Sequence, residues 1–169
     1  MAADQRNESV SGTPVAPLAG VFSVAGSGGT EMVVKEREAG VEAAFLNSTL
    51  DLEETQDTEQ RLLRGELTLL YAAPERVTTP RFLALLDQVH ERGLLGLFAI
   101  DEAHCVSQWG HDFRPQYVQL KTLRSALSGV PCIALTASAT PEVLEDMVQL
   151  LGLVNPFIAQ GSFARPNLI

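Results

Sequence analysis

The sequence predicts an α/β protein with a mostly parallel sheet between helices. Three observations carry this prediction. Short apolar runs alternate with stretches of helical length, and glycines or prolines separate them. The uncharged run from Gly93 to Ile100 is typical of a strand that is buried on both faces. A chain of 169 residues with 46% hydrophobic content fits one globular domain with a sizeable core.

The first half of the chain alternates as follows. Val21 to Gly40 has the outline of a short strand, a glycine-rich turn and a helix. A strand near Glu42 to Leu46 precedes a polar helix near Leu52 to Arg64, which Gly65 ends. Another strand is expected near Leu67 to Tyr71.

The second half repeats the pattern around Gly93 to Ile100. A helix near Thr79 to Arg92 has Pro80 in its first turn, where proline is favoured. Its apolar residues recur at three- and four-residue steps and form one face: Phe82, Leu85, Leu86 and Val89. After the central strand we expect an amphipathic helix at Tyr117 to Leu127 and a buried strand at Cys132 to Leu135. A further helix begins at Thr140 to Glu142.

Two acids, Asp101 and Glu102, directly follow the central apolar run. In an open α/β sheet, ligands bind at the carboxyl ends of strands. One carboxylate can hold Mg²⁺ while the other orients or deprotonates a water, and phosphoryl transfer needs both roles. The alternative interpretation is a strand that simply ends in a polar turn.

The continuation favours a site, because residues 103–115 hold the only Trp and two of the three His beside the acids. This stretch resembles the DEAH box and aromatic-rich loop of the RecQ family of ATP-dependent DNA helicases. The resemblance covers more than three quarters of the chain, through AGVEAAFLNSTL, ELTLLYAAPERVTTPRF, the DEAH stretch, VPCIALTASATPEVLEDMVQLLGL and FARPNL.

The resemblance implies a RecA-like P-loop NTPase domain, the first motor half of a DEAH-box, superfamily 2 helicase, incomplete in its N-terminal part. It implies ATP and Mg²⁺ as cofactors, and 3′–5′ DNA unwinding in recombination and repair as the activity. Asp101 would hold Mg²⁺ directly or through water, and Glu102 would activate the attacking water. His104 would link DNA binding to hydrolysis.

The same resemblance assigns two further sets of residues. Thr136 and Ser138 match a motif that couples ATP to DNA, with Ser138 where the family usually has a second Thr. The residues that match the loop sensing single-stranded DNA are Gln108, Trp109, His111, Phe113 and Arg114. Arg76 matches a contact to the DNA backbone. An alternative for Trp109 and Phe113 is that they pack under the loop.

The glycine-rich turn departs from the family pattern. A working phosphate-binding loop places Lys and then Ser or Thr after its last glycine. Here Thr30 follows Gly29, and the chain's only lysines are Lys35 and Lys121. We therefore interpret the turn as a degenerate or replaced phosphate loop, either a flexible linker or a weak anion site. Its candidate phosphate-binding residues are Gly26, Gly28, Gly29 and Thr30.

These patterns predict the organisation of the chain. Residues 1–20 form a disordered tail without the features of a signal peptide, and residues 21–37 hold the degenerate glycine-rich region. Residues 38–161 form the partial helicase ATP-binding domain. Residues 162–169 begin a linker to a second motor domain that we expect this chain to lack.

The composition restricts the partners. A net charge of −9 argues against binding DNA by bulk electrostatics, so contact with single-stranded or tailed duplex DNA should be local. Cys105 and Cys132 follow no disulfide framework and are expected to be reduced, as in a cytoplasmic protein, nucleoid-associated if bacterial. His104, Cys105 and His111 lack the spacing and the fourth ligand of a structural zinc site, so we expect no zinc. No apolar run is long enough for a membrane helix.

The prediction is therefore a RecQ-like helicase fragment that is inactive by itself. Two alternatives stay open: a non-catalytic remnant that binds DNA or a protein, and a fragment completed by another chain. The strand at Cys132 to Leu135 is expected to form an apolar sheet edge that favours self-association. Val21 to Val24 would cover that edge only partly.

Overall fold

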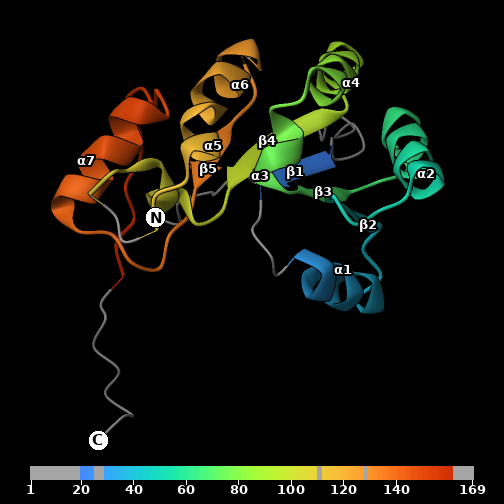
Figure 1. Cartoon of the computed structure of the whole chain (residues 1–169), viewed down its shortest axis with the longest axis horizontal. Helices are drawn as coiled ribbons and strands as arrows, with labels where there is room; N and C mark the ends of the chain where they lie inside the picture. Colours follow the sequence, from blue (N-terminus) through green and yellow to red (C-terminus); the bar gives the residue numbers. More distant parts are fainter. Residues whose placement is uncertain (1–19, 25–28, 110–111, 128, 162–169) are drawn as a thin grey trace, which may run out of the picture.

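A five-stranded parallel sheet forms the centre of the protein (Figure 1). The computed structural model describes residues 20–24, 29–109, 112–127 and 129–161. The strands are β1 (Gly20–Val24), β2 (Ala43–Leu46), β3 (Leu69–Ala72), β4 (Leu95–Ile100) and β5 (Cys132–Ala134). They lie in the order β2-β3-β1-β4-β5, which confirms the predicted α/β class.

Helices connect these strands and cover both faces of the sheet. They are α1 (Gly29–Glu38), α2 (Leu52–Leu63), α3 (Pro74–Val77), α4 (Pro80–Glu91), α5 (Pro115–Val118), α6 (Leu120–Ala126) and α7 (Pro141–Leu150), with the 3₁₀ turn η1 (Ala103–Val106). In Figure 1, α1 lies on one side of the sheet, and α2, α4 and α6 lie on the other.

Local chemistry explains where the long helices begin and end. Asp51 accepts a hydrogen bond from the backbone N–H of Glu54, whose side chain accepts one from the N–H of Asp51, so α2 begins with a capping box. The hydroxyls of Thr79 and Thr140 cap α4 and α7, each followed by a proline in the first helical position. Gly65 adopts φ +71° where the chain leaves α2, a conformation that costs glycine little.

The main core lies between the sheet and the side that carries α2, α4 and α6. Phe22 of β1 and Phe98 of β4 are paired in register and stack with ring centroids 5.4 Å apart. Phe82 of α4 lies at the same distance from Phe22. A smaller cluster on the other face joins Val33 of α1 to Tyr71 of β3. The buried central strands explain the uncharged runs of the sequence.

Two details of the expected structure are wrong. Val21 to Val24 does not approach Cys132 to Leu135, because β1 is inserted between β3 and β4 and pairs with both. The stretch Tyr117 to Leu127 is not one helix. It divides at Gln119, where α5 ends and α6 begins, because Pro115 starts a separate turn after the preceding loop.

β5 forms one edge of the sheet, as predicted, since within the described residues it pairs only with β4. Ile133 in β5 and Leu135 directly after it are 40% and 46% exposed. The division of the chain into a tail, a glycine-rich region, a domain and a linker stays a prediction, because much of it concerns residues outside the described ranges. No described helix is both long and apolar enough to cross a bilayer.

Candidate active site

The predicted acid pair lies where β4 ends, at the carboxyl edge of the sheet. The backbone N–H of Asp101 donates to the carbonyl of Val24 in β1 over 3.0 Å. On the other side, Leu135 donates to the carbonyl of Ile100 over 2.8 Å. The backbone N–H of Ala103, which follows the two acids, donates to the carbonyl of Leu135 over 2.9 Å. Backbone bonds to both neighbouring strands therefore fix the two acids at the edge where parallel sheets bind ligands.

Glu102 has a strained backbone. Its φ of 49° and ψ of 40° are in the left-handed region, which is uncommon for a residue with a Cβ atom. Its N–H donates to Oδ1 of Asp101 over 2.9 Å, which helps to hold this turn. The carboxylate of Glu102 is half exposed and reaches the ring of His104. Strain of this kind is concentrated at functional sites, where surrounding contacts maintain it.

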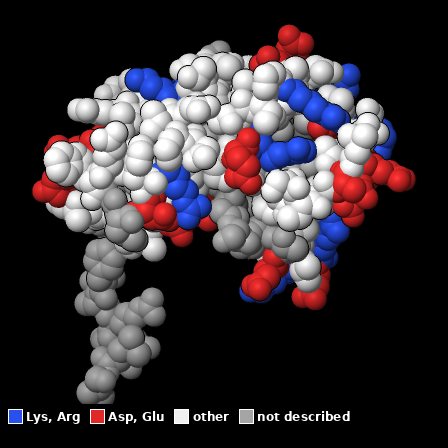
Figure 2. All heavy atoms as spheres, in the orientation of Figure 1, with Lys and Arg blue, Asp and Glu red and all other residues white. Residues whose placement is uncertain are grey.

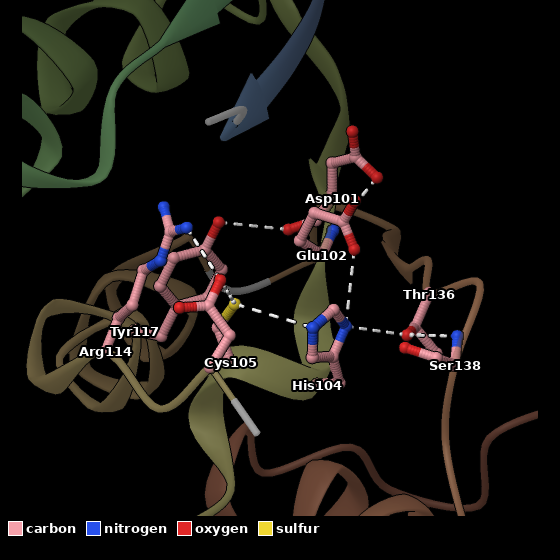
Figure 3. A network of polar contacts seen from close by, with 9 residues as sticks. Asp101, Glu102, His104, Cys105, Arg114, Tyr117, Thr136 and Ser138 are labelled. Atoms are coloured by element: carbon pink, nitrogen blue, oxygen red, sulfur yellow. Dashed lines mark hydrogen bonds and ion pairs between the residues drawn. The ribbon is translucent and has the colours of Figure 1, made fainter. Parts of the chain in front are cut away.

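His104 connects Glu102 to the segment after β5 (Figure 3). Its Nδ1 lies 3.3 Å from Oε2 of Glu102 and 2.9 Å from the hydroxyl of Thr136. The Thr136 hydroxyl also accepts from the N–H of Ser138 over 3.2 Å. A carboxylate can only accept, so these contacts favour the tautomer with the proton on Nδ1. These contacts bring Glu102, His104, Thr136 and Ser138 together.

A second series of contacts runs from His104 into the following loop. The Cys105 thiol lies 3.8 Å from Nε2 of His104 and 3.7 Å from Oδ2 of Asp112. Nη2 of Arg114 donates to the same carboxylate over 2.7 Å, and the Arg114 N–H donates to the carbonyl of Cys105 over 2.9 Å. Polar contacts therefore connect the water-activating candidate Glu102 to Arg114 without a break.

The charges and burial of this series shift its pKa values. The Arg114 guanidinium beside Asp112 holds the pKa of that carboxyl below its usual value. Burial, together with the Asp112 carboxylate, raises the pKa of the Cys105 thiol to about 11. The thiol is therefore protonated at neutral pH and acts as a weak hydrogen-bond donor, not as a nucleophile.

The buried side chains of Tyr117 and Ser107 form hydrogen bonds that hold the segment after β4 in place. The hydroxyl of Tyr117 donates to the carbonyl of Asp101 over 3.2 Å, and burial raises its pKa. Ser107 donates to Oδ2 of Asp146 in α7 over 2.6 Å and accepts from the N–H of Trp109 over 3.1 Å. The roles of Tyr117, Ser107 and Asp146 could not be predicted from the sequence, because they depend on contacts between distant segments.

The predicted DNA-sensing residues lie mostly on the surface. Trp109 is 81% exposed and Phe113 is 36% exposed, so the alternative that Trp109 packs under the loop is wrong. Gln108 is exposed beside it. His111 lies outside the described residues. An exposed indole offers a surface on which a base can stack, and Arg114, five residues further along the chain, carries a cation.

Arg114 also lines a hollow of about 400 Å³ between the ends of β2 and β3. Its other lining residues are Phe45, Asn47, Ser48, Thr49, Ala73, Pro74 and Glu75. Oδ1 of Asn47 accepts from the N–H and the hydroxyl of Thr49, which shapes this polar wall. Arg76 is half-buried in α3 and does not line the hollow. This hollow was not predicted from the sequence, because its wall forms only where the segments after β2 and β3 meet.

The phosphate-binding candidates are not assembled into a described site. Gly26 and Gly28 lie outside the described residues, and Gly29 and Thr30 begin α1. Lys35 lies in the last turn of α1, and Lys121 lies in α6. In the described part of the chain, no lysine therefore follows a glycine turn at the sheet edge that carries Asp101.

The surface carries no continuous basic area on the face seen in Figure 2. Lys and Arg side chains there lie beside acidic ones or are separated by uncharged surface. Arg81 is paired with Glu59 over 2.6 Å. This arrangement agrees with the net charge of −9.

Comparisons with known proteins identify relatives of this chain. The DEAD/DEAH box helicase family matches residues 30–147. The chain is 44% identical to the ATP-dependent DNA helicase RecQ of Pasteurella multocida over 76% of its own length and 20% of that protein. It is 46% identical to ATP-dependent DNA helicase Q5 of Rattus norvegicus over 75% of its length and 13% of that protein. It thus spans a fifth or less of these two relatives.

Among solved structures, the helicase domain of Hef from Pyrococcus furiosus shares 19% identity with this chain. The likeness covers 79% of this chain and 27% of that one, with a TM-score of 0.47, which is too low to decide the fold by itself.

Proposed function

The chain belongs to the DEAD/DEAH box helicase family, and we propose that it forms the part of a RecQ-like, ATP-dependent 3′–5′ DNA helicase that carries the hydrolytic acids and the DNA-sensing loop. The observation that supports this most is the continuous set of contacts from Glu102 through His104, Cys105 and Asp112 to Arg114. The relatives are named as DNA helicases, and we extend DNA unwinding, with a role in recombination and repair, to the protein that contains this chain.

The two acids fit a magnesium ion. Mg²⁺ prefers oxygen ligands and usually keeps several waters, so one or two carboxylates suffice to hold it. Asp101 would hold the ion, directly or through water, and Glu102 would orient the attacking water. When bound, Mg²⁺ would neutralise charge on the ATP phosphates. The carboxylate of Glu102 is half exposed and can reach a substrate water at the sheet edge.

His104 would transmit a conformational change of the loop to Glu102. Its ring is buried, and its two nitrogens contact different partners. A shift of Asp112 and Arg114 on binding DNA would move Cys105 or His104, and the Nδ1 proton shared between Glu102 and Thr136 would move with the ring. Thr136 and Ser138 would couple this movement to the segment after β5. DNA binding would thereby change the orientation of the water-activating acid.

Single-stranded DNA would bind locally. Bases would stack on Trp109 and Phe113, while Arg114 would contact the backbone, with Gln108, His111 and Arg76 as further contacts by resemblance. The hollow beside Arg114 would take a phosphate next to the hydroxyl of Thr49. The acidic net charge opposes wider contact.

Further proposals concern the setting of the protein. We propose that it works in the cytoplasm, associated with the nucleoid if the source is bacterial. We also propose that the exposed edge at β5 allows self-association, because an unpaired strand with apolar side chains can pair with another chain. The weak phosphate site at Gly26, Gly28, Gly29 and Thr30 stays a proposal as well.

A chimera tests the proposed function. Residues 38–161 would replace the matching segment in a full-length RecQ relative that is active. We expect DNA-stimulated phosphate release and unwinding to be retained, since the acids and the loop are supplied by this chain. Glu102→Gln should lower hydrolysis about 10²–10⁴-fold, the usual contribution of a general base. A folded chimera without activity would contradict the proposal.

A further inference from the structure

The side chains of His104, Cys105 and Asp112 converge between η1 and the loop that follows it. Their potential ligand atoms all lie within 4.8 Å of one another. The Cys105 thiol is 3.8 Å from Nε2 of His104 and 3.7 Å from Oδ2 of Asp112. Nitrogen, sulfur and carboxylate oxygen are the ligands that Zn²⁺ accepts in proteins.

We propose that these three residues form a binding site for a single thiophilic divalent cation such as Zn²⁺. With metal–sulfur bonds of about 2.3 Å and metal–nitrogen or metal–oxygen bonds of about 2.0–2.2 Å, tetrahedral ligands lie about 3.6 Å apart. The two separations that involve the thiol are already close to this value. The ligand atoms of His104 and Asp112, which lie within 4.8 Å of each other, would move closer together as the site closes around an ion.

Groups behind the three ligands support this assignment. A histidine that binds metal commonly donates its other N–H to a carboxylate or another acceptor. Here Nδ1 of His104 lies 3.3 Å from Glu102 and 2.9 Å from Thr136, which leaves Nε2 turned toward the thiol. Arg114 holds the Asp112 carboxylate from the opposite side over 2.7 Å.

The site is accessible and leaves one position open. The side chain of Asp112 is 46% exposed, so an ion can enter from the loop side while His104 and Cys105 stay buried. A water would complete the tetrahedral shell. Binding would release the thiol proton, because the thiolate is the form that coordinates metal.

The inference reverses the expectation of no zinc, which rested on spacing along the sequence. Asp112 stands seven residues after Cys105 and was not considered as a ligand, because only the folded loop brings it back to the thiol. An ion at this site would tie η1 to the loop that carries Trp109. We therefore expect it to restrict the loop. This proposal does not depend on the helicase activity.

Cobalt provides the test, because Co²⁺ bound to a thiolate gives a charge-transfer band in the near ultraviolet. The reduced chain would be titrated with Co²⁺ and then with Zn²⁺. We expect saturation at one cobalt per chain, and loss of the band when zinc displaces the cobalt. Cys132→Ser should keep the band, whereas Cys105→Ser should remove it.

Asp112→Asn provides a second test if Cys105→Ser fails to fold, because the Asp112 side chain is half exposed. This variant should weaken cobalt binding at least about 10-fold while circular dichroism stays unchanged. The proposal is overturned if the native chain gives no thiolate band, if Cys105→Ser retains it, or if Asp112→Asn binds cobalt as tightly as the native chain.

Discussion

At the scale of single residues, Glu102 and His104 form the centre of the site. The left-handed backbone of Glu102 directs its carboxylate to the imidazole, and the imidazole connects it to Thr136 and Cys105. Cys105 and Cys132 are both free thiols, as predicted. Cys105 does more than pack, however, since it lies between the histidine and the loop. A hydrolytic role for the acids thus depends on a polar network and not on two isolated side chains.

The 169-residue chain, tested by itself, should not hydrolyse ATP at a rate above buffer, although both acids are present. The physical reason is that no described lysine lies where it can meet the β- and γ-phosphates. Phosphate release with and without single-stranded DNA is the measurement. DNA-stimulated release that Glu102→Gln abolishes would contradict this expectation.

Cys105 should make the fold less stable at alkaline pH. Its folded pKa is raised to about 11 from 9.0, so the unfolded state loses its thiol proton first. Below pH 9 the thiol is protonated in both states, and the free energy of unfolding keeps its full value. As the pH rises from 9 toward 11, the unfolded state loses the proton while the folded state keeps it, so the free energy of unfolding falls. The loss amounts to about 2 kcal/mol at the upper end.

Urea unfolding at pH 8 and at pH 10.5 would measure this effect. Cys105→Ala removes the titrating thiol, so the difference in unfolding free energy between the native chain and the variant should shrink at the higher pH. Tyr117 stays in both proteins, and burial, which is the main cause of its raised pKa, is common to both. An unchanged difference would show that the thiol does not titrate differently in the two states.

The sequence predicted some of these residues and could not predict others. Asp101, Glu102 and His104 are nearly adjacent in the chain, so the end of a buried strand indicated the acids, and the resemblance to the RecQ family assigned the roles of all three. Cys105 and Asp112 are brought together by a loop conformation that no periodicity encodes. The hydrogen bond from buried Ser107 to half-buried Asp146 joins residues 39 positions apart and left no local signal.

At the scale of elements, the positions of β1 and β5 determine the strand order and the edge at which the sheet is exposed. The position of β1 between β3 and β4 depends on pairing with strands that follow it by 45 residues or more along the sequence, and hydrophobic pattern alone does not fix such an order. β5 was easier to predict, because its apolar run and its following turn are local. The break at Gln119 was missed, since an amphipathic pattern can continue through two short helices.

The β5 edge should make the chain associate. The side chains of Ile133 and Leu135 are exposed at this edge, and within the part of the chain that the structure describes β5 pairs only with β4. We expect low amide-exchange protection at Cys132 to Leu135 in dilute protein, and an apparent mass that grows with concentration in sedimentation.

Ile133→Lys should suppress this association, because a charge on an edge strand opposes pairing with another chain. Val34→Lys is the matched control, since Val34 is 53% exposed but lies on α1, away from the edge. A chain that remains monomeric at high concentration, with strong protection at Cys132 to Leu135, would show that the edge is covered.

At the scale of the whole molecule, an acidic protein is expected to contact DNA through a small area. The net charge of −9 repels phosphate, and the described basic side chains include several that are paired with acids, such as Arg61, Arg64 and Arg81. The exposed indole of Trp109 remains as the main local surface for bases, and Arg114, although paired with Asp112 over 2.7 Å, keeps 44% of its side chain exposed. Binding should therefore be weak and only modestly sensitive to salt.

A single residue reports on this surface, because Trp109 is the only tryptophan in the chain. Stacking of a base on an exposed indole quenches its fluorescence, so a titration with single-stranded DNA observes the proposed contact directly. Trp109→Ala should abolish binding as measured by anisotropy of a labelled oligonucleotide. Phe157→Ala is the control, since Phe157 is 93% exposed but lies beyond α7.

The fluorescence of Trp109 during titration with single-stranded DNA, repeated at several salt concentrations, tests most directly whether DNA reaches the active site through this loop. We expect saturable quenching, with a logarithmic salt slope shallower than about −1.5, as one or two phosphate contacts would give. Tight binding with a steep salt slope and no change in Trp109 emission would contradict the account, because DNA would then bind elsewhere on the protein.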